Sequence, residues 1–294
     1  MQDAATQRVR SFHRVVTQRI GALHDEYLAR GRSLGASRML WEIGHEGADL
    51  RELRVRLDLD SGYLSRLLRS LEQEGLVAVE PSAPDRRVRT ARLTAAGRAE
   101  LALLDERGDE LARSLLAPLG EAQRSRLVEA MDVVERLLTA TLVEVGIEDP
   151  SGDAGRFCIE SYFAELERRF DGGYVSRPTL SAAAGELTVF LVARLRGEAI
   201  GCGGLKLHGD EPAEIRRMWV APSARGLGVG RRILGEIEQH ARRRGVAVVR
   251  LETNRTLTEA ASLYRSAGYV ETKRFGSELD ADHWFEKRLT SRAS

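Results

Sequence analysis

Apolar residues recur at steps of three and four near both ends of the first half of the chain, a spacing that places them on one face of a helix. The first such helix carries Val9, Phe12, Val16, Ile20 and Leu23. The second begins at Glu121 and carries Leu127, Met131, Val134, Leu138 and Leu142. From residue 143 to 147 the apolar positions alternate instead, which is strand spacing. We therefore expect two domains, residues 1–140 and 141–294, with almost no linker.

Between the two long helices, the pattern predicts three shorter helices and a hairpin. The helices are expected over Leu34–Ile43, Leu50–Leu57 and Ser61–Glu74. Asp49 is suited to cap the second of them and Asp58 or Asp60 the third, because a short polar side chain accepts hydrogen bonds from the first helical amides. The strands of the hairpin are expected over Leu76–Glu80 and Val88–Leu93.

The third short helix presents polar and arginine side chains outward after a short turn, which is typical of a helix-turn-helix. The loop of the hairpin is rich in arginine and can reach DNA phosphates and the minor groove. The side chains expected to contact DNA are Ser61, Tyr63, Ser65, Arg66, Arg69, Asp85, Arg86, Arg87 and Arg89. A single outward arginine is more often a solvated surface group, so this expectation depends on the whole assembly of helix, hairpin and loop.

Two stretches of this region resemble the MarR family of winged-helix regulators. They are Leu64–Val77, and Asp85–Gly97 with its Asp-Arg-Arg loop and Leu-Thr-x-x-Gly helix start. The likeness covers roughly residues 5–140, matches Arg87 to the family's wing arginine and matches Asp85 to its partner acid. It implies a homodimer formed by the first and last helices, which places two recognition helices on an inverted repeat in double-stranded DNA. A winged helix that mediates only protein contacts stays open, because acidic and basic side chains are equally numerous in this half.

In the second half, a glycine-rich loop separates a strand from a helix. A hairpin of two strands, Glu186–Arg194 and Ala199–Leu207, precedes the strand Glu214–Val220. The loop Arg225–Arg231 then opens directly into an amphipathic helix, and a further strand is expected over Val246–Glu252. Glycines permit close approach of a ligand, and the first amides of a helix lack internal partners, so this junction suits a pyrophosphate. The spacing matches neither the Gly-x-Gly-x-x-Gly of dinucleotide-binding folds nor a Walker loop with its lysine, which disfavours NAD and ATP.

The junction is similar to the phosphate loop of the GNAT acetyltransferase superfamily, Arg/Gln-x-x-Gly-x-Gly/Ala. Arg225, Gly228 and Gly230 match that pattern, and Ala261–Tyr269 resembles the family's Leu-Tyr-x-x-x-Gly-Phe/Tyr helix. The likeness covers about residues 142–290 and implies an α/β domain with a mixed, mostly antiparallel sheet that binds acetyl-CoA. The residues expected to contact acetyl-CoA are Met218, Trp219, Val220, Arg225, Gly226, Leu227, Gly228, Val229, Gly230, Arg231, Asn254 and Tyr264.

The resemblance assigns a catalytic role to one residue, and a nearby carboxylate is a candidate for a second role. Tyr264 matches the family's tyrosine that protonates the departing CoA sulfur, although an aromatic residue in an amphipathic helix is commonly a core residue. Glu214, on the strand before the loop, is the candidate general base, and a solvated strand carboxylate is an equally simple interpretation. One amide in Met218–Val220 is expected to hold the developing oxyanion.

The acceptor site is expected to be built from Cys158–Phe170, the 171–185 loop and Gly276–Trp284, with Tyr162, Arg216 and His283 among its lining residues. Strand alternation predicts that Glu214, Arg216 and Met218 share one face, and an acid beside a guanidinium suits a small amine or amino acid. The alternatives are a protein-lysine acetyltransferase, an acetyl-CoA sensor without turnover, and an enzyme whose winged helix only dimerises it.

Composition restricts these possibilities without choosing among them. The chain of 294 residues is 43% hydrophobic with a formal net charge of +1, which excludes a globally cationic nucleic-acid coat. Cys158 and Cys202 are too few for a disulfide framework and are expected to be buried packing groups in a reducing cytoplasm. No apolar run approaches the ~20 residues of a membrane span, and the histidines lack metal-ligand spacing, so neither membrane nor metal is expected.

Overall fold

The computed structural model divides the chain into two compact units, residues 1–130 and 131–294. It describes residues 2–23, 27–29, 31–81, 88–175, 177–209, 211–276 and 278–289. The predicted wing residues Asp85, Arg86 and Arg87 lie outside the described residues. The division between the units falls within α6, which ends directly before the first strand of the second unit.

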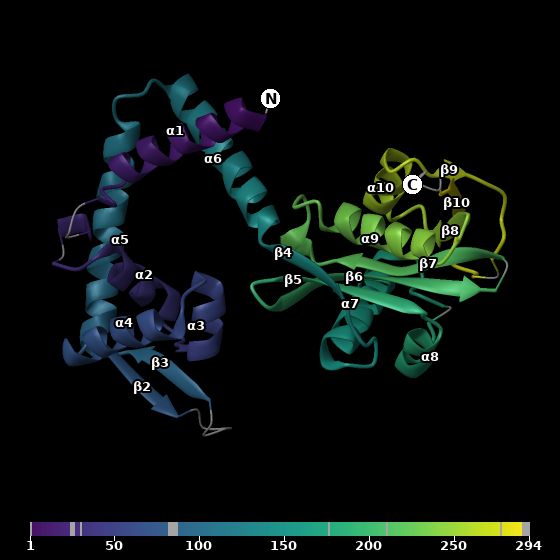
Figure 1. Cartoon of the computed structure of the whole chain (residues 1–294), viewed down its shortest axis with the longest axis horizontal. Coiled ribbons are helices and arrows are strands. Elements are labelled where there is room, and N and C mark those ends of the chain that lie inside the picture. The colour runs from purple at the N-terminus through teal and green to yellow at the C-terminus, as the bar shows by residue number, and fades with distance from the viewer. Residues whose placement is uncertain are drawn as a thin grey trace. The chain divides into compact units, whose positions relative to one another are not determined.

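The first unit has the predicted order of three short helices and a hairpin between two long helices (Figure 1). Its elements are α1 (Gln2–Arg19), η1 (Tyr27–Ala29), α2 (Leu34–Ile43), β1 (Ala48–Asp49), α3 (Leu50–Leu57), α4 (Ser61–Gln73), β2 (Val77–Pro81), β3 (Arg89–Leu93), α5 (Ala95–Leu116) and α6 (Glu121–Thr141). The strands form a small antiparallel sheet in the order β1-β3-β2. Apolar residues of α2, α3, α4 and α5 meet over this sheet in one core that includes Met39, Leu53, Leu71 and Leu104.

Local capping explains where these helices begin. Asp49 accepts hydrogen bonds from the amides of α3, and Asp60, rather than Asp58, caps α4 through the amide of Tyr63 at 2.8 Å. The Thr94 hydroxyl accepts from the amide of Gly97 at 3.0 Å and donates to the Gly75 carbonyl at 2.7 Å. A Cβ at position 97 would lie 2.0 Å from the Leu76 carbonyl oxygen, so the Leu-Thr-x-x-Gly sequence is required where α5 crosses the start of β2.

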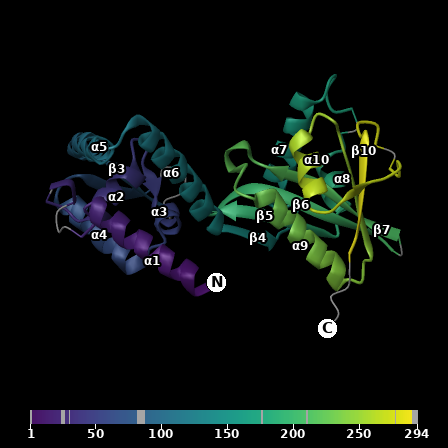
Figure 2. The same ribbon diagram turned by 90° about the horizontal axis from the view of Figure 1, so that it is seen from above.

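The second unit is a seven-stranded sheet with helices on both faces (Figures 1 and 2). Its elements are β4 (Val143–Ile147), α7 (Asp153–Arg169), α8 (Leu180–Gly185), β5 (Val189–Leu195), β6 (Glu198–His208), β7 (Glu211–Val220), η2 (Pro222–Ala224), α9 (Val229–Arg243), β8 (Val248–Thr253), α10 (Thr258–Ser266), β9 (Val270–Glu271) and β10 (His283–Arg288). The strand order is β4-β5-β6-β7-β8-β10-β9, and every pair is antiparallel except β7 with β8. The predicted mixed, mostly antiparallel sheet is therefore confirmed.

The two faces of this sheet have separate cores. Residues of α9 and α10 cover one face, and those of α7 and α8 cover the other, where Cys158 and Cys202 are both fully buried. On β6, a Cβ at Gly203 would lie 2.5 Å from the Met218 sulfur and 2.7 Å from Ile233 of α9. Glycine there allows α9 to approach the sheet closely, which fixes the position of the loop that begins the helix.

A bulge in β7 reverses the strand's alternation. Cys202 of β6 pairs with Trp219 and Gly204 pairs with Arg216, so two residues of β7 oppose one of β6, and Arg217 has a φ of 57°. Before the bulge Ile215 lies in the core under α9, and after it Met218 packs against that same core. The prediction that Glu214, Arg216 and Met218 share a face is therefore wrong for Met218, because the inserted residue turns it to the opposite face.

β7 and β8 pair only at their beginnings. The parallel register joins Ala213 with Val249 and Glu214 with Arg250, and no later pair is formed between these two strands. The sheet is thus open between β7 and β8 beyond residue 214, next to the loop before α9. Among the described residues, no helix is long and apolar enough to cross a bilayer.

Candidate active site

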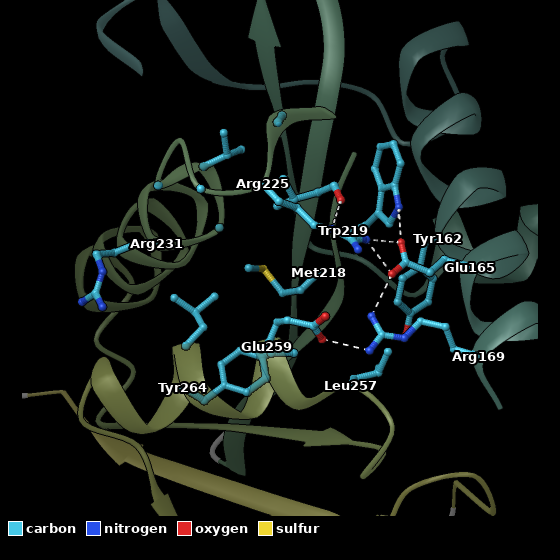
Figure 3. A pocket seen from close by; sticks show the side chains of 18 of the residues that line it. Tyr162, Glu165, Arg169, Met218, Trp219, Arg225, Arg231, Leu257, Glu259 and Tyr264 are labelled. Carbon is cyan, nitrogen blue, oxygen red and sulfur yellow. Dashed lines mark hydrogen bonds and ion pairs between the residues drawn. The ribbon is translucent and has the colours of Figure 1, made fainter. Parts of the chain in front are cut away.

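A cavity of about 460 Å3 lies where β7 separates from β8. Its wall is formed by α7, the end of β7, the glycine loop and α10 (Figure 3). Of the residues expected to contact acetyl-CoA, those that line this cavity are Met218, Trp219, Val220, Arg225, Gly226, Gly228, Val229, Gly230, Arg231 and Tyr264. Leu227 and Asn254 are not among its lining residues.

The glycine loop presents free backbone amides to this cavity. Gly226 and Gly228 have φ values of 85° and 74°, and open space surrounds the place where a Cβ would lie on each. Gly228 is the N-cap of α9 and provides no side-chain cap, and the first helical bond runs from the Arg232 amide to the Gly228 carbonyl. The amides of residues 229–231 precede that bond and are left as donors at the positive end of the helix dipole, where an anion is stabilised.

The Arg225 side chain, in contrast, is held by the protein itself. Its Nη2 lies 2.6 Å from both carboxylate oxygens of Glu165, a buried residue of α7. Glu165 also accepts from the Trp219 indole at 3.1 Å and from Arg169 at 3.2 Å. Arg169 in turn lies 2.9 Å from Glu259 of α10, so a chain of charges runs along one wall of the cavity (Figure 3).

Sequence reasoning missed Glu165 and Arg169. Both lie on α7 among apolar residues, and their partners come from segments about 50 to 90 residues away. The intrahelical Glu165–Arg169 spacing was the one local signal, and such pairs are common on solvated helix faces.

Tyr264 lies on α10. Its ring packs in the core, and the residue also lines the cavity. The ring contacts Tyr269 and Phe285, with centroids 6.0 and 5.9 Å away. Burial, and after it the neighbouring Tyr162, raises the pKa of Tyr264 above its ordinary value. The phenol therefore keeps its proton at neutral pH, as a proton donor must.

A second, smaller cavity of about 80 Å3 adjoins the first. The two share six lining residues from α7, β7, α10 and the N-cap of α10: Tyr162, Leu166, Met218, Leu257, Ala260 and Tyr264. The predicted acceptor residues Tyr162 and Arg216 line the second cavity, and His283 lines neither, because its ring pairs with Glu271 at 2.6 Å. Asn254 also lines the second cavity, where its amide donates to the Asp280 carbonyl and its oxygen accepts from the Thr256 amide.

Carboxylates surround Arg216 in the second cavity. Arg216 pairs with Glu214 at 2.9 Å, with Glu186 at 3.4 Å and, through a very short contact, with Glu278. The side chain of Arg216 is 15% exposed. Its donors are thus already directed to protein carboxylates.

The structure does not bring Glu214 to either cavity. Its carboxylate pairs with Arg216 and lies 3.2 Å from His208 Nε2. Burial raises the pKa of Glu214, but the hydrogen bond and charge of Arg216, with the charges of His208 and Lys206, outweigh it and lower the pKa. Because the residue lies outside both linings and its basicity is reduced, the geometry argues against the predicted role as general base.

In the first unit, α4 presents the predicted polar face. Ser61, Tyr63, Ser65, Arg66 and Arg69 are all exposed, while Leu64, Leu68 and Leu71 are buried on the opposite side. The Arg66 guanidinium lies over the Tyr63 ring, 5.7 Å from its centroid. Arg89 begins β3 and is exposed beside the end of the hairpin.

Comparison with known proteins assigns families to both units. The family model of the GNAT acetyltransferase domain matches residues 186–271, and the model of the MarR family matches residues 31–88. The IAA acetyltransferase of Azospirillum brasilense is 32% identical over 143 residues, which are 46% of this chain and 88% of that protein. The chain belongs to the GNAT acetyltransferase family and also carries a MarR-family domain. We refer to the second unit as the GNAT domain and to the first as the MarR domain.

Further similarities are to other acetyltransferases. The mycothiol acetyltransferase of Cellulomonas flavigena is 36% identical over 93 residues, which are 28% of this chain and 27% of that protein. A solved structure of a GNAT-family acetyltransferase from Staphylococcus aureus covers 50% of this chain and 99% of its own, with 15% identity and a TM-score of 0.44.

Proposed function

We propose that the GNAT domain is an acetyl-CoA-dependent N-acetyltransferase for a small amine or amino acid, and that the MarR domain makes the chain a dimeric DNA-binding regulator. The observation that carries the enzymatic part is the junction of the two cavities. One cavity has free helix amides for a diphosphate, the other has charged side chains for an acceptor, and Tyr264 lines both.

The first cavity suits the pyrophosphate of acetyl-CoA. The uncapped start of α9 supplies donors, and the positive φ values of Gly226 and Gly228 leave the space that a phosphate needs. The end of β7 is free of β8 and offers backbone groups at Met218–Val220 for the pantetheine arm. When bound, acetyl-CoA supplies an acetyl group activated as a thioester.

The residues of the chain then have distinct tasks at the junction. Tyr264 holds a proton at its phenolic oxygen and is placed to give it to the departing sulfur. The bulge at Arg217 takes backbone groups out of the sheet beside Met218, and an amide there is placed to stabilise a developing oxyanion.

Turnover distinguishes an enzyme from a sensor. Release of free thiol from acetyl-CoA is measured with a panel of amines, amino acids and a lysine-containing protein. We expect turnover with at least one small amine or amino acid, whereas binding of acetyl-CoA without thiol release would identify a sensor. Activity confined to the protein substrate would contradict the proposed acceptor.

Exposed apolar residues on the first and last helices support the dimer. On α1 these include Val9, Phe12 and Val15, and on α6 they include Val128, Met131 and Leu138, which share one face of the helix. Such a stripe is unfavourable in water and is typical of a helix that packs against another chain. We expect the α4 helix of each copy to contact one half-site of an inverted repeat.

DNA binding is tested with Arg69→Ala. Footprinting of the DNA upstream of the coding region should show a protected inverted repeat. Removal of one phosphate contact from each copy should weaken binding uniformly and reduce the salt slope by about 1 per copy, or about 2 for the dimer. Arg113→Ala, on an exposed part of α5, is the matched control and should leave the slope unchanged. A wild-type chain that protects no DNA would instead identify a winged helix with a purely dimerising role.

A further inference from the structure

Glu252 lines the second cavity, and its carboxylate forms only a long ion pair. Glu252 lies on β8, and the one ion pair it forms with the described residues joins its Oε1 to Arg216 Nη1 at 3.8 Å. Glu278 lines the same cavity but is held by a very short contact with Arg216. Oε2 of Glu252 is buried and forms no hydrogen bond of standard geometry with the part of the chain that the structure describes. The indole N–H of Trp284 is also buried without a hydrogen bond of standard geometry among these residues, and it is the polar group that interacts with this carboxylate from β10.

The surroundings of Glu252 make it a stronger base than an ordinary glutamate. Burial raises the pKa of Glu252, the charge of Arg216 lowers it, and the charges of Glu278 and Glu214 raise it again, with a net increase. From β10, Trp284 lies opposite Glu252 in the register of the two strands, and the interaction with its indole N–H lowers the pKa by a smaller amount. These are the charged and polar neighbours that face this carboxylate from β7, β10 and the 272–282 loop.

Position also favours Glu252 over Glu214. Glu252 lines the second cavity together with Tyr264, whereas Glu214 lines neither cavity. An amine in the second cavity would therefore lie between a carboxylate and the wall where Tyr264 faces the thioester site. The side chain of Glu252 is 15% exposed, so few water molecules compete for the proton.

We propose that Glu252, rather than Glu214, is the catalytic base that takes a proton from the acceptor ammonium in the second cavity. The inference rests on the proposed acetyltransferase function. The ammonium loses one proton to the Glu252 carboxylate, directly or through one water, and its nitrogen forms the C–N bond of the amide. The C–S bond breaks, and the sulfur takes the proton of Tyr264. The second proton lost by the nitrogen returns to Tyr264, and the proton on Glu252 passes to solvent.

Arg216 acts in this account as a positioning residue. Ion pairs with Glu186, Glu214 and Glu278 fix its guanidinium. The longer contact with Glu252, at 3.8 Å, places that carboxylate at the edge of the cluster. The cluster therefore keeps the Glu252 carboxylate in place at the wall of the second cavity.

The test compares three single carboxamide variants in the full chain, Glu252→Gln, Glu214→Gln and Glu286→Gln. Glu286 of β10 pairs with Arg250 at 2.8 Å outside both cavities, so it is the matched control for loss of a carboxylate from this sheet. Acetyl-CoA affinity is measured by calorimetry. Values of kcat and KM are measured from pH 5 to 9 with the best acceptor among tyramine, spermidine and the standard amino acids.

Glu252→Gln should lower kcat/KM by about 100-fold or more and remove the acid limb of the pH profile, with little change in acetyl-CoA affinity. Glu252→Asp should restore part of the activity together with the acid limb, which a purely structural role would not do. Glu214→Gln should lose less than about tenfold, and Glu286→Gln should match the wild type. Retention of the wild-type pH profile by Glu252→Gln, or an equal loss in Glu214→Gln, would overturn the proposal. A wild-type chain that binds no acetyl-CoA, or binds it without turnover, would instead overturn the proposed enzyme and leave Glu252 with no proton to take.

Discussion

The two cavities of the GNAT domain bind by different means. The larger one presents the backbone amides of a single loop beside a wall of side chains that pair with one another, while the smaller one presents charged side chains that come from β7, β8 and residues 278–280. A site made of backbone tolerates change in its side chains but depends on its glycines. A site made of paired charges depends on every member, because removal of one leaves its partner uncompensated. This difference separates the variants that should affect acetyl-CoA from those that should affect the acceptor.

Tyr264→Phe should have the largest effect, because this residue lines both cavities. Loss of the phenolic proton should lower kcat by about 100-fold, while the retained ring keeps the core contacts with Tyr269 and Phe285. Thiol release gives kcat, and calorimetry should show acetyl-CoA affinity within about threefold of the wild type, a difference that corresponds to less than 1 kcal/mol. Full activity in this variant would remove Tyr264 from the mechanism.

Glu165→Gln tests whether side chains also support the larger cavity. The substitution removes the charge that holds Arg225 and Arg169, and it should lower the free energy of unfolding by about 2 kcal/mol. Urea denaturation measures this change. Glu160→Gln, on an exposed position of α7, is its control and should be neutral. If Glu165→Gln also left the free energy of unfolding unchanged, the charges along this wall would not contribute measurably to stability.

Gly228→Ala should weaken the binding of acetyl-CoA without changing the binding of the acceptor. A φ of 74° costs a residue with a Cβ about 1–2 kcal/mol, so the loop should leave its conformation and acetyl-CoA should bind about tenfold more weakly. Gly235→Ala, within α9 and with open space around its Cβ position, is the control and should bind normally. An acceptor KM that rose while acetyl-CoA affinity stayed constant would reverse the assignment of the two cavities.

Glu278→Gln should give the smallest effect and the complementary pattern. Loss of one carboxylate from the second cavity should raise the KM of a cationic amine by about threefold, because the ion pair is partly exposed. Acetyl-CoA affinity should not change. Steady-state kinetics at fixed acetyl-CoA measures this, and a change confined to acetyl-CoA would contradict the separation of the sites.

The same contrast explains what the sequence could predict. The loop Arg225–Arg231 and the helix after it are local features, so the sequence predicts their structure and their fit to an anion. The second cavity depends on a bulge at Arg217 that reverses the alternation of the strand. The residue pattern of the strand does not predict this bulge. Glu252 becomes a candidate base only because β8 lies beside Arg216 in the folded sheet.

The helix α4 shows a similar limit in the first unit. Its inward leucines and outward polar residues follow from periodicity, and Asp60 caps it as one of two predicted alternatives. The reason for Gly97 could not be derived from sequence alone, because it is the contact with the Leu76 carbonyl.

The central claim is that the free amides at the start of α9 hold the diphosphate of coenzyme A. Amide chemical shifts of a 15N-labelled chain, followed during titration with coenzyme A, test it directly. We expect the largest shifts at Gly228, Val229, Gly230 and Arg231, with smaller shifts in α6 and in the MarR domain. Saturable binding that leaves these four amides unchanged and shifts another region would contradict the account.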